Sequence, residues 1–261
     1  PNDPRFSEQW GLTFARADLA WGTARTVNAT GTSTLVAIVD SGVQVDHPDL
    51  ASRIAPSTTW GRCDTGTCRS YNPSDSSTFP SDGDGHGTHV AGIVAAATDN
   101  AVGVAGVAGD RPVQIVPVKV LNDNGDGTTD GVAAGIAWAV TKGAKVINMS
   151  LGGPTDTVTV NSAIAAAANA GVLVVTSAGN CGGADFQSQG CTSQNEYDYP
   201  AAYAGTASGA NQLIPVASID SNGVLSSFST RAPYVANAGL AAPGGMITST
   251  YRGSAYWAMS G

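Results

Sequence analysis

Three polar residues of this chain stand where side chains often act on a bound molecule, at the end of an apolar run or the start of a helix. Asp40 and Asn180 each end an apolar run, and His86 follows a glycine-rich turn and opens another apolar stretch. A carboxylate can orient an imidazole, an imidazole can move protons, and an amide can donate a hydrogen bond to an oxyanion. Together they indicate a charge-stabilising site.

Each of these residues also has an ordinary structural interpretation. Asp40 is a common type of helix cap or turn former, and Asn180 is a common turn residue. His86 is compatible with a buried structural histidine. All three structural interpretations would have to hold together, so we favour the joint site.

A metal site is the alternative interpretation of the same histidine. His86 and His89 share a helix face, and Asp82 or Asp84 could complete a ligand set. His47 is the remaining histidine, so the sequence has no further His or Cys cluster to support a metal. A metal-dependent hydrolase would lose activity with a zinc chelator and ignore serine-directed reagents, and the residues alone leave this possibility open.

Alternating strands and helices must position these residues. The apolar runs predict strands over residues 34–39, 113–121, 145–149, 172–176 and 213–219. Ala-rich stretches predict helices over residues 86–97, 131–142 and 159–170. This alternation predicts an α/β fold with a doubly wound, mainly parallel sheet and helices on both faces. Ligands bind such sheets outside the carboxyl ends of their strands, where Asp40 and Asn180 fall.

Composition narrows the class of protein. The 261 residues predict one domain over 1–261, and the net charge of −8 argues against nucleic acid as a partner. Hydrophobic residues make up 42% and charged residues 12%, which excludes a disordered chain. The longest apolar run, 163–175, is too short and polar to cross a membrane. No signal peptide is visible, and Pro1 is typical of a mature or trimmed start.

Four cysteines form two local pairs, Cys63 with Cys68 and Cys181 with Cys191, each flanking a polar loop. Local pairing is the simplest of the three possible connectivities. Two zinc half-sites are the alternative, but neither pair has the short spacing of a zinc knuckle. Disulfides favour an oxidising, extracellular location, so we expect a secreted protein.

Four ordered motifs resemble the signature blocks of the subtilisin-like serine proteases. They are Val39-Asp-Ser-Gly42, Gly85-His-Gly-Thr-His-Val-Ala-Gly92, Ser150-Leu-Gly-Gly153 and Ser177-Ala-Gly-Asn180. The segments 1–4 and 226–230 are similar to the thermitase-type branch of that family. The similarity extends from residue 1 to residue 261.

This resemblance implies a broad-specificity endopeptidase that forms an acyl-enzyme. Asp40 would orient His86, His86 would move the protons, and Asn180 would donate to the oxyanion. Proteins or peptides would be the substrates, a protein inhibitor or propeptide a further partner, and the enzyme a monomer.

The family's nucleophilic serine lies in a Gly-Thr-Ser-Met-Ala block that opens a buried helix. Gly261 aligns with the glycine of that block, so the resemblance places the serine two residues beyond Gly261. Ser260 precedes the turn and is no substitute. We therefore expect a C-terminal segment or a complementing fragment. A catalytically silent peptide-binding chain is the alternative function; it should bind peptide product or inhibitor without hydrolysing substrate.

The family binds peptide as an extended strand between two backbone segments. By match, the substrate-binding residues are Gly125, Asp126, Gly127, Ser150, Leu151, Gly152, Gly153, Ser177, Ala178 and Gly179. Gly152 and Gly153 leave room for a sizeable side chain in the S1 pocket, so we expect a large apolar P1 residue. Asp126 at the rim favours basic residues further along the substrate.

The resemblance also implies a calcium site. Its side-chain ligands would be Asp3, Asp49 and Asn100, and its backbone carbonyl ligands Ala97, Val102 and Val104. Hard oxygen donors of these kinds suit Ca²⁺. Asp49 has the alternative interpretation of a turn residue after a proline. A second family calcium site, in the region 60–82, is not carried over because a cysteine-containing loop replaces it.

Three further features can be checked against a structure. Asn28 and Asn148 begin N-glycosylation sequons, but Asn148 is expected in a buried strand. Tyr199 and Pro200 match a family position that has a cis peptide bond.

Overall fold

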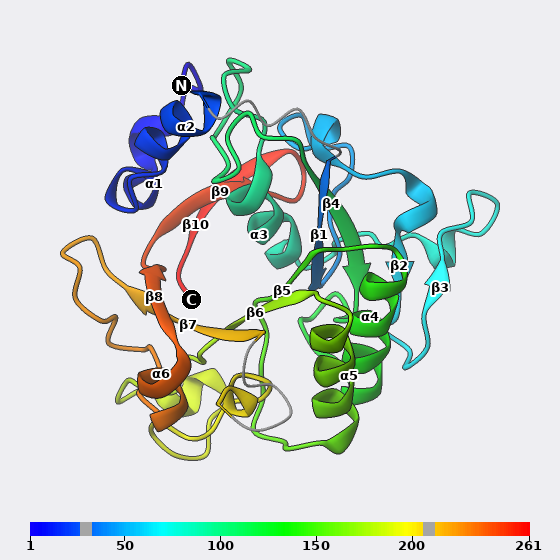
Figure 1. Ribbon diagram of the computed structural model, residues 1–261, viewed down its shortest axis with the longest axis vertical. Helices are drawn as coiled ribbons and strands as arrows, with labels where there is room; N and C mark the ends of the chain where they lie inside the picture. The colour runs from blue at the N-terminus through cyan, green and yellow to red at the C-terminus, as the bar shows by residue number, and fades with distance from the viewer. Residues whose placement is uncertain (27–32, 206–211) are drawn as a thin grey trace.

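An eight-stranded sheet forms the centre of the fold in the computed structural model, which describes residues 1–26, 33–205 and 212–261 (Figure 1). The strand order is β3-β2-β4-β1-β5-β6-β7-β8. The strands are β1 Thr34–Asp40, β2 Gly61–Arg62, β3 Arg69–Ser70, β4 Val113–Lys119, β5 Val146–Met149, β6 Leu173–Ser177, β7 Leu213–Ile219 and β8 Leu240–Pro243. All neighbours pair in parallel except β2 and β3, which confirms the predicted sheet.

The described part of the chain has helices on both faces of the sheet. The helices are α1 Trp10–Phe14, α2 Ala17–Thr26, α3 His86–Ala95, α4 Thr129–Thr141, α5 Val158–Asn169 and α6 Pro233–Ala238. Helices α4 and α5 lie side by side against one face, and α3 lies against the other (Figure 1). This arrangement is the doubly wound α/β architecture that the sequence predicts.

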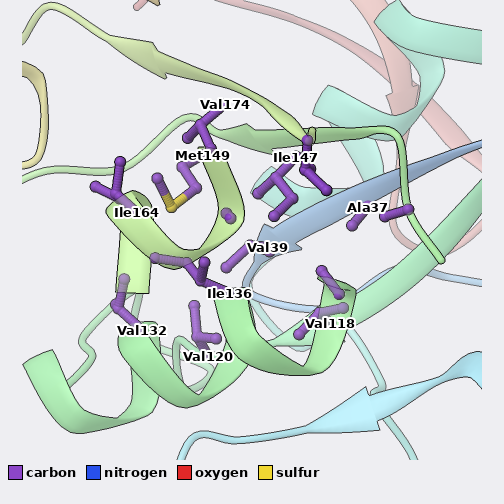
Figure 2. Packing of buried hydrophobic residues seen from close by; sticks show 14 of the residues in the cluster. Ala37, Val39, Val118, Val120, Val132, Ile136, Ile147, Met149, Ile164 and Val174 are labelled. Atoms are coloured by element: carbon purple, nitrogen blue, oxygen red, sulfur yellow. The ribbon is translucent and has the colours of Figure 1, made fainter. Parts of the chain in front are cut away.

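Strand β1 shows why its sequence is apolar without alternation. Ala37 and Val39 belong to the core beneath α4 and α5, together with Ile136 (Figure 2). Val36 and Ile38 belong to the core beneath α3. Because both faces of the strand are buried, each of its side chains needs an apolar partner until Asp40 ends the run.

The predicted elements all exist, and their ends lie within two residues of the predicted ones. Helix α3 ends at Ala95 rather than residue 97, because Ala96 adopts an extended backbone (φ −51°, ψ 141°). Helix α4 begins two residues before the prediction, where the Thr128 side chain accepts a hydrogen bond from Gly131 N–H and caps it. Strand β4 ends at Lys119 rather than residue 121.

A C-terminal hairpin, which the sequence analysis did not predict, packs against α3. It consists of β9 Ile247–Tyr251 and β10 Ala255–Met259, paired antiparallel. Ser249 Oγ and Thr250 Oγ1 donate to the carbonyl oxygens of His89 and Thr88, 2.8 and 2.7 Å away. The buried hydroxyls of Ser249 and Thr250 are thus satisfied by the backbone of α3.

The short N-terminal helices were also not predicted. Leu12 and Trp21, from α1 and α2, pack with Ala105 in a small separate cluster, and Trp21 Nε1 donates to the Val107 carbonyl at 2.8 Å. No helix in the described part of the chain is long and apolar enough to cross a membrane.

Two disulfides join Cys63 to Cys68 and Cys181 to Cys191, which confirms local pairing. The Tyr199–Pro200 peptide bond is cis, as the resemblance implies. Asn148 lies in β5, whereas the sequon at Asn28 lies outside the described residues.

Candidate active site

Asp40 and His86 form a hydrogen-bonded pair at the carboxyl end of the sheet. Asp40 ends β1 and is fully buried, and its Oδ1 accepts from His86 Nδ1 at 2.7 Å. The same oxygen accepts from Ser41 N–H at 2.7 Å. The Nδ1 proton therefore points at the carboxylate, which leaves Nε2 of His86 for proton transfer.

Two glycines let the loop after β1 approach the start of α3 this closely. Gly42 has φ 112°, and a Cβ atom there would collide with the carbonyl of Ser81. A Cβ atom at Gly87 would collide with the carbonyl oxygen of Gly42. Any side chain at these positions would push Asp40 and His86 apart.

Asp82 holds the first turn of α3 in place. Its Oδ1 accepts from Gly85 N–H at 2.7 Å and from Ser41 Oγ at 2.9 Å. Its Oδ2 accepts from the N–H and hydroxyl groups of Thr88 at 2.8 and 2.5 Å. This carboxylate caps the helix and links it to the residue after Asp40.

The geometry disfavours the alternative of a metal held by the two histidines. His89 Nε2 is hydrogen-bonded to the carbonyls of Ile247 and Trp257, at 2.9 and 3.1 Å, and not directed at His86. Asp84 Oδ1 accepts from His86 N–H at 3.0 Å. Among residues 1–26, 33–205 and 212–261, no group of three or more His, Cys, Asp or Glu side chains could hold a metal ion.

The acidic surroundings raise the pKa of His86 to about 9. Burial acts in the opposite direction and is the largest single influence, but it is outweighed by the charge and hydrogen bond of Asp40 and by the charges of Asp84 and Asp82. The pair therefore stabilises the imidazolium, and its contribution to folding is fully present below the ordinary histidine pKa and is lost as the pH rises through about 9.

We expect His86 to titrate near pH 9 in a ¹³C NMR titration of the histidine ring. Asp40→Asn should lower that midpoint by more than a unit, because it removes the charge that favours the imidazolium. His47, whose pKa is lowered by burial and which is not coupled to Asp40 or His86, serves as the internal reference. If His86 of the wild type titrates near the ordinary histidine pKa and Asp40→Asn does not change its midpoint, this account is contradicted.

Asn180 lies on the same cavity as His86, a space of about 620 Å³. It follows β6 in a segment fixed by its backbone: Thr230 N–H donates to the Gly179 carbonyl at 2.9 Å, and Cys181 N–H donates to Thr230 Oγ1 at 3.0 Å. His86 and Asn180 thus line one cavity, and the backbone on both sides of Asn180 is held by Thr230.

The predicted peptide-binding segments line the two cavities beside His86. A space of about 610 Å³ is lined by Gly125, Asp126, Gly127, Ser150, Leu151, Gly152 and Gly153. Residues 150–153 also line the cavity that Asn180 lines, together with Ser177 and Gly179. Ala178 lines neither: it is buried, and its carbonyl accepts from Tyr234 Oη at 2.9 Å.

Asp198 is a residue of this cavity that the sequence analysis missed. Its carboxylate lies between Gly152 and Gly179, because a Cβ atom at either glycine would collide with it. Asp198 directly precedes the cis peptide, so the Tyr-Pro motif could have drawn attention to it. Nothing in the sequence showed that it faces the two glycines.

The apolar part of the larger cavity lies beneath the carboxyl ends of β6 and β7. Val175 and Val216 from the sheet, Val90 from α3 and Ile247 from β9 line it, and so does Gly261. Figure 1 shows the C-terminus between β10 and β7. Gly261 N–H donates to the Gly244 carbonyl at 2.9 Å, which fixes this end of the chain beside the site.

The predicted calcium ligands lie together at the loop after α3. Asp3 and Asp49 are buried, and Asp3 accepts from the N–H groups of Asp99 and Asn100 at 3.0 and 3.3 Å. Asp49 accepts from Val104 N–H and from Asn100 Nδ2, both at 2.8 Å.

This donor set fits calcium. Burial, with Asp3 adding repulsion, raises the pKa of Asp49, so the two carboxylates need a compensating cation. Asp3, Asp49 and the carbonyls of the loop would hold Ca²⁺, which would supply that charge and no chemistry of its own. Asn100 presents its nitrogen to Asp49, so its amide oxygen is not directed at the carboxylates.

Comparisons with known proteins point to one family. Residues 31–261 match the profile of peptidase S8, the subtilase family. Thermitase from Thermoactinomyces vulgaris is 40% identical over 100% of this chain and 79% of its own. Subtilisin DY from Bacillus licheniformis is 38% identical over 88% of this chain and 72% of its own. Subtilisin Savinase from Lederbergia lenta is 35% identical over 98% of this chain and 78% of its own.

Proposed function

Because the chain belongs to the subtilase family, we propose that it is the catalytic part of a secreted, calcium-stabilised serine endopeptidase. The observation that carries this proposal is the 2.7 Å hydrogen bond between the buried carboxylate of Asp40 and His86, on the cavity that Asn180 also lines. The two disulfides support secretion, since such bonds persist in oxidising surroundings.

In the proposed mechanism, Nε2 of His86 takes the proton of a serine hydroxyl as the serine oxygen attacks the peptide carbonyl. Asp40 holds the imidazole in the required tautomer and stabilises the imidazolium. Asn180 donates to the oxyanion. His86 then protonates the leaving amine, and water, deprotonated by the same imidazole, hydrolyses the acyl-enzyme.

The proposal places the serine on a segment that follows Gly261, as the resemblance implies. Gly261 lies on the same cavity as His86 and Asn180, so a residue shortly after it can reach the imidazole. The apolar lining contributed by Val175 and Val216 supports the expectation that this segment, or a complementing fragment, packs there as a helix.

The substrate would be a protein or peptide chain bound between residues 125–127 and 150–153. Main-chain pairing there is independent of side chains, which suits broad specificity. Because a general base must be neutral, kcat/KM should rise with pH toward about 9, the pKa of His86.

A fluorophosphonate probe tests the proposed function. It reacts with an activated serine, so the full-length product of the gene should gain one adduct, found by intact mass and mapped to a peptide beyond residue 261. Ser260→Ala should keep the adduct and His86→Ala should lose it. A folded protein that gains no adduct but still binds peptide would favour the silent peptide-binding alternative.

A further inference from the structure

Asp198 occupies a slot between two of the predicted substrate-binding segments, residues 150–153 and 177–179. Its carboxylate lies against Gly152 on one side and Gly179 on the other, and neither glycine has a side chain to cover it. All three residues line the cavity that holds Asn180. A side chain that enters this slot from the cleft therefore meets a carboxylate.

The backbone of Asp198 is fixed, but its carboxylate is incompletely paired. Asp198 N–H donates to Tyr234 Oη at 3.2 Å, and its carbonyl accepts from Ala202 N–H at 2.8 Å. Oδ1 is buried without a hydrogen-bond partner in the described part of the chain. Of the ion pairs among residues 1–26, 33–205 and 212–261, none involves Asp198.

The surroundings of this carboxylate favour a positively charged guest. Burial raises the pKa of Asp198 to about 7; the Gly153 N–H opposes the shift, and the charge of Glu196 adds to it. The phenols of Tyr199 and Tyr234 lie nearby, and burial raises the pKa of both, so neither adds a charge. A buried anion without a counterion is unfavourable, and a bound cation would relieve that cost.

We propose that Asp198 makes the S1 pocket selective for lysine or arginine at P1. This inference rests on the proposed function and specifies its substrate class. The long, unbranched stem of either residue would lie along the cavity wall beside Gly152 and Gly179, and its charged end would pair with the carboxylate of Asp198.

An apolar P1 side chain fits this slot less well. It would cover the carboxylate without offering a hydrogen bond, which is costly. The expectation of a large apolar P1 residue rests on the room that Gly152 and Gly153, beside residues 177–179, leave for a sizeable side chain. Asp198, remote from them in sequence, changes the chemistry of that space. One measurement of P1 preference decides between the two.

The test is a set of peptide substrates that differ only at P1, cleaved by the active full-length enzyme. We expect kcat/KM to be highest for arginine or lysine. Asp198→Asn should lower it for these substrates by about 100-fold, as expected when one partner of a buried charge pair is removed. Cleavage after leucine should be unchanged or faster.

Asp185→Asn is the matched control, because Asp185 is an exposed carboxylate of a neighbouring loop and does not line this cavity. Its backbone carbonyl accepts from Ser188 N–H at 2.9 Å, within its own turn. The arginine-to-leucine ratio of this variant should stay close to that of wild type. An equal loss of the ratio in both variants would show a general effect of charge and overturn the role of Asp198.

A pH series on the wild type provides a test without a variant. The ratio of kcat/KM for arginine over leucine cancels the titration of His86, which both substrates share. It should rise about tenfold between pH 6 and 8, as a carboxyl group with a pKa of about 7 ionises. A flat ratio would contradict the inference.

These measurements distinguish a failure of the inference about Asp198 from a failure of the proposed function. An enzyme that cleaves best after phenylalanine, leucine or alanine would overturn the inference on Asp198 and leave the proposed function intact. A protein that cleaves no member of the set would count against the proposed function. Calorimetry with product peptides that end in lysine or leucine then tests the pocket by itself, and equal affinities would overturn the inference.

Discussion

Replacing Asp40 by asparagine should lower kcat/KM for peptide hydrolysis by about 10⁴-fold, the magnitude known for this aspartate in serine proteases as a class, subtilisin included. Asp40 Oδ1 receives the Nδ1 proton of His86 at 2.7 Å. The amide of asparagine can instead donate a hydrogen bond to Nδ1, so that the imidazole carries its proton on Nε2. Nε2 then cannot accept the proton of the serine hydroxyl. Substrate hydrolysis by the purified full-length enzyme measures the effect.

A double variant shows whether Asp40 acts through His86. His86→Ala alone should remove nearly all activity, and Asp40→Asn in that background should cost little more, since residues that act as a unit are not additive. Asp130→Asn, which removes an exposed carboxylate from the first turn of α4, should leave the rate near wild type. Additive losses from Asp40→Asn and His86→Ala would contradict the proposed pair.

Removing calcium should produce the largest loss of stability. A cation present at 1,000 times its dissociation constant stabilises the folded state by about 4 kcal/mol. For a chain of this size that corresponds to a fall in Tm of about 10 °C on chelation. Calorimetry with excess calcium and with excess chelator measures the difference. This difference in Tm should shrink as the pH falls, because a protonated Asp49 carboxyl group does not bind calcium.

Variants of the calcium ligands separate binding from other effects of the chelator. Asp49→Asn should lower Tm in calcium and remove most of the further fall on chelation. Asp220 is a suitable control, because it also accepts backbone N–H groups in a loop, from Asn222 and Val224. Asp220→Asn should keep the full calcium-dependent increment. A Tm that does not respond to calcium in wild type would reject the site.

Local patterns were sufficient to predict much of the fold. Strands buried on both faces have apolar residues throughout, so β1 and β7 could be recognised without knowing their neighbours. The ends of such strands converge at one edge, which predicted that Asp40 and Asn180 would lie near His86. Spacing alone also predicted both disulfides.

The features that the sequence did not predict depend on contacts between remote segments. Ser249 and Thr250 of strand β9 are polar residues that can be buried because α3 offers them its carbonyls. Asp198 belongs to the cavity because the chain folds back beside Gly152. Short helices such as α1 have too few turns for a clear apolar period.

The contacts between α3 and the hairpin also set an order of assembly. His89 is hydrogen-bonded to carbonyls 158 and 168 positions further along the chain. A growing chain that has not yet produced Trp257 therefore lacks the partners that hold this helix. Contacts of such long range form slowly. The pair of His86 and Asp40 should thus reach its final geometry only after the hairpin has been made, so that a chain broken before Trp257 should not hold the proposed catalytic pair in place.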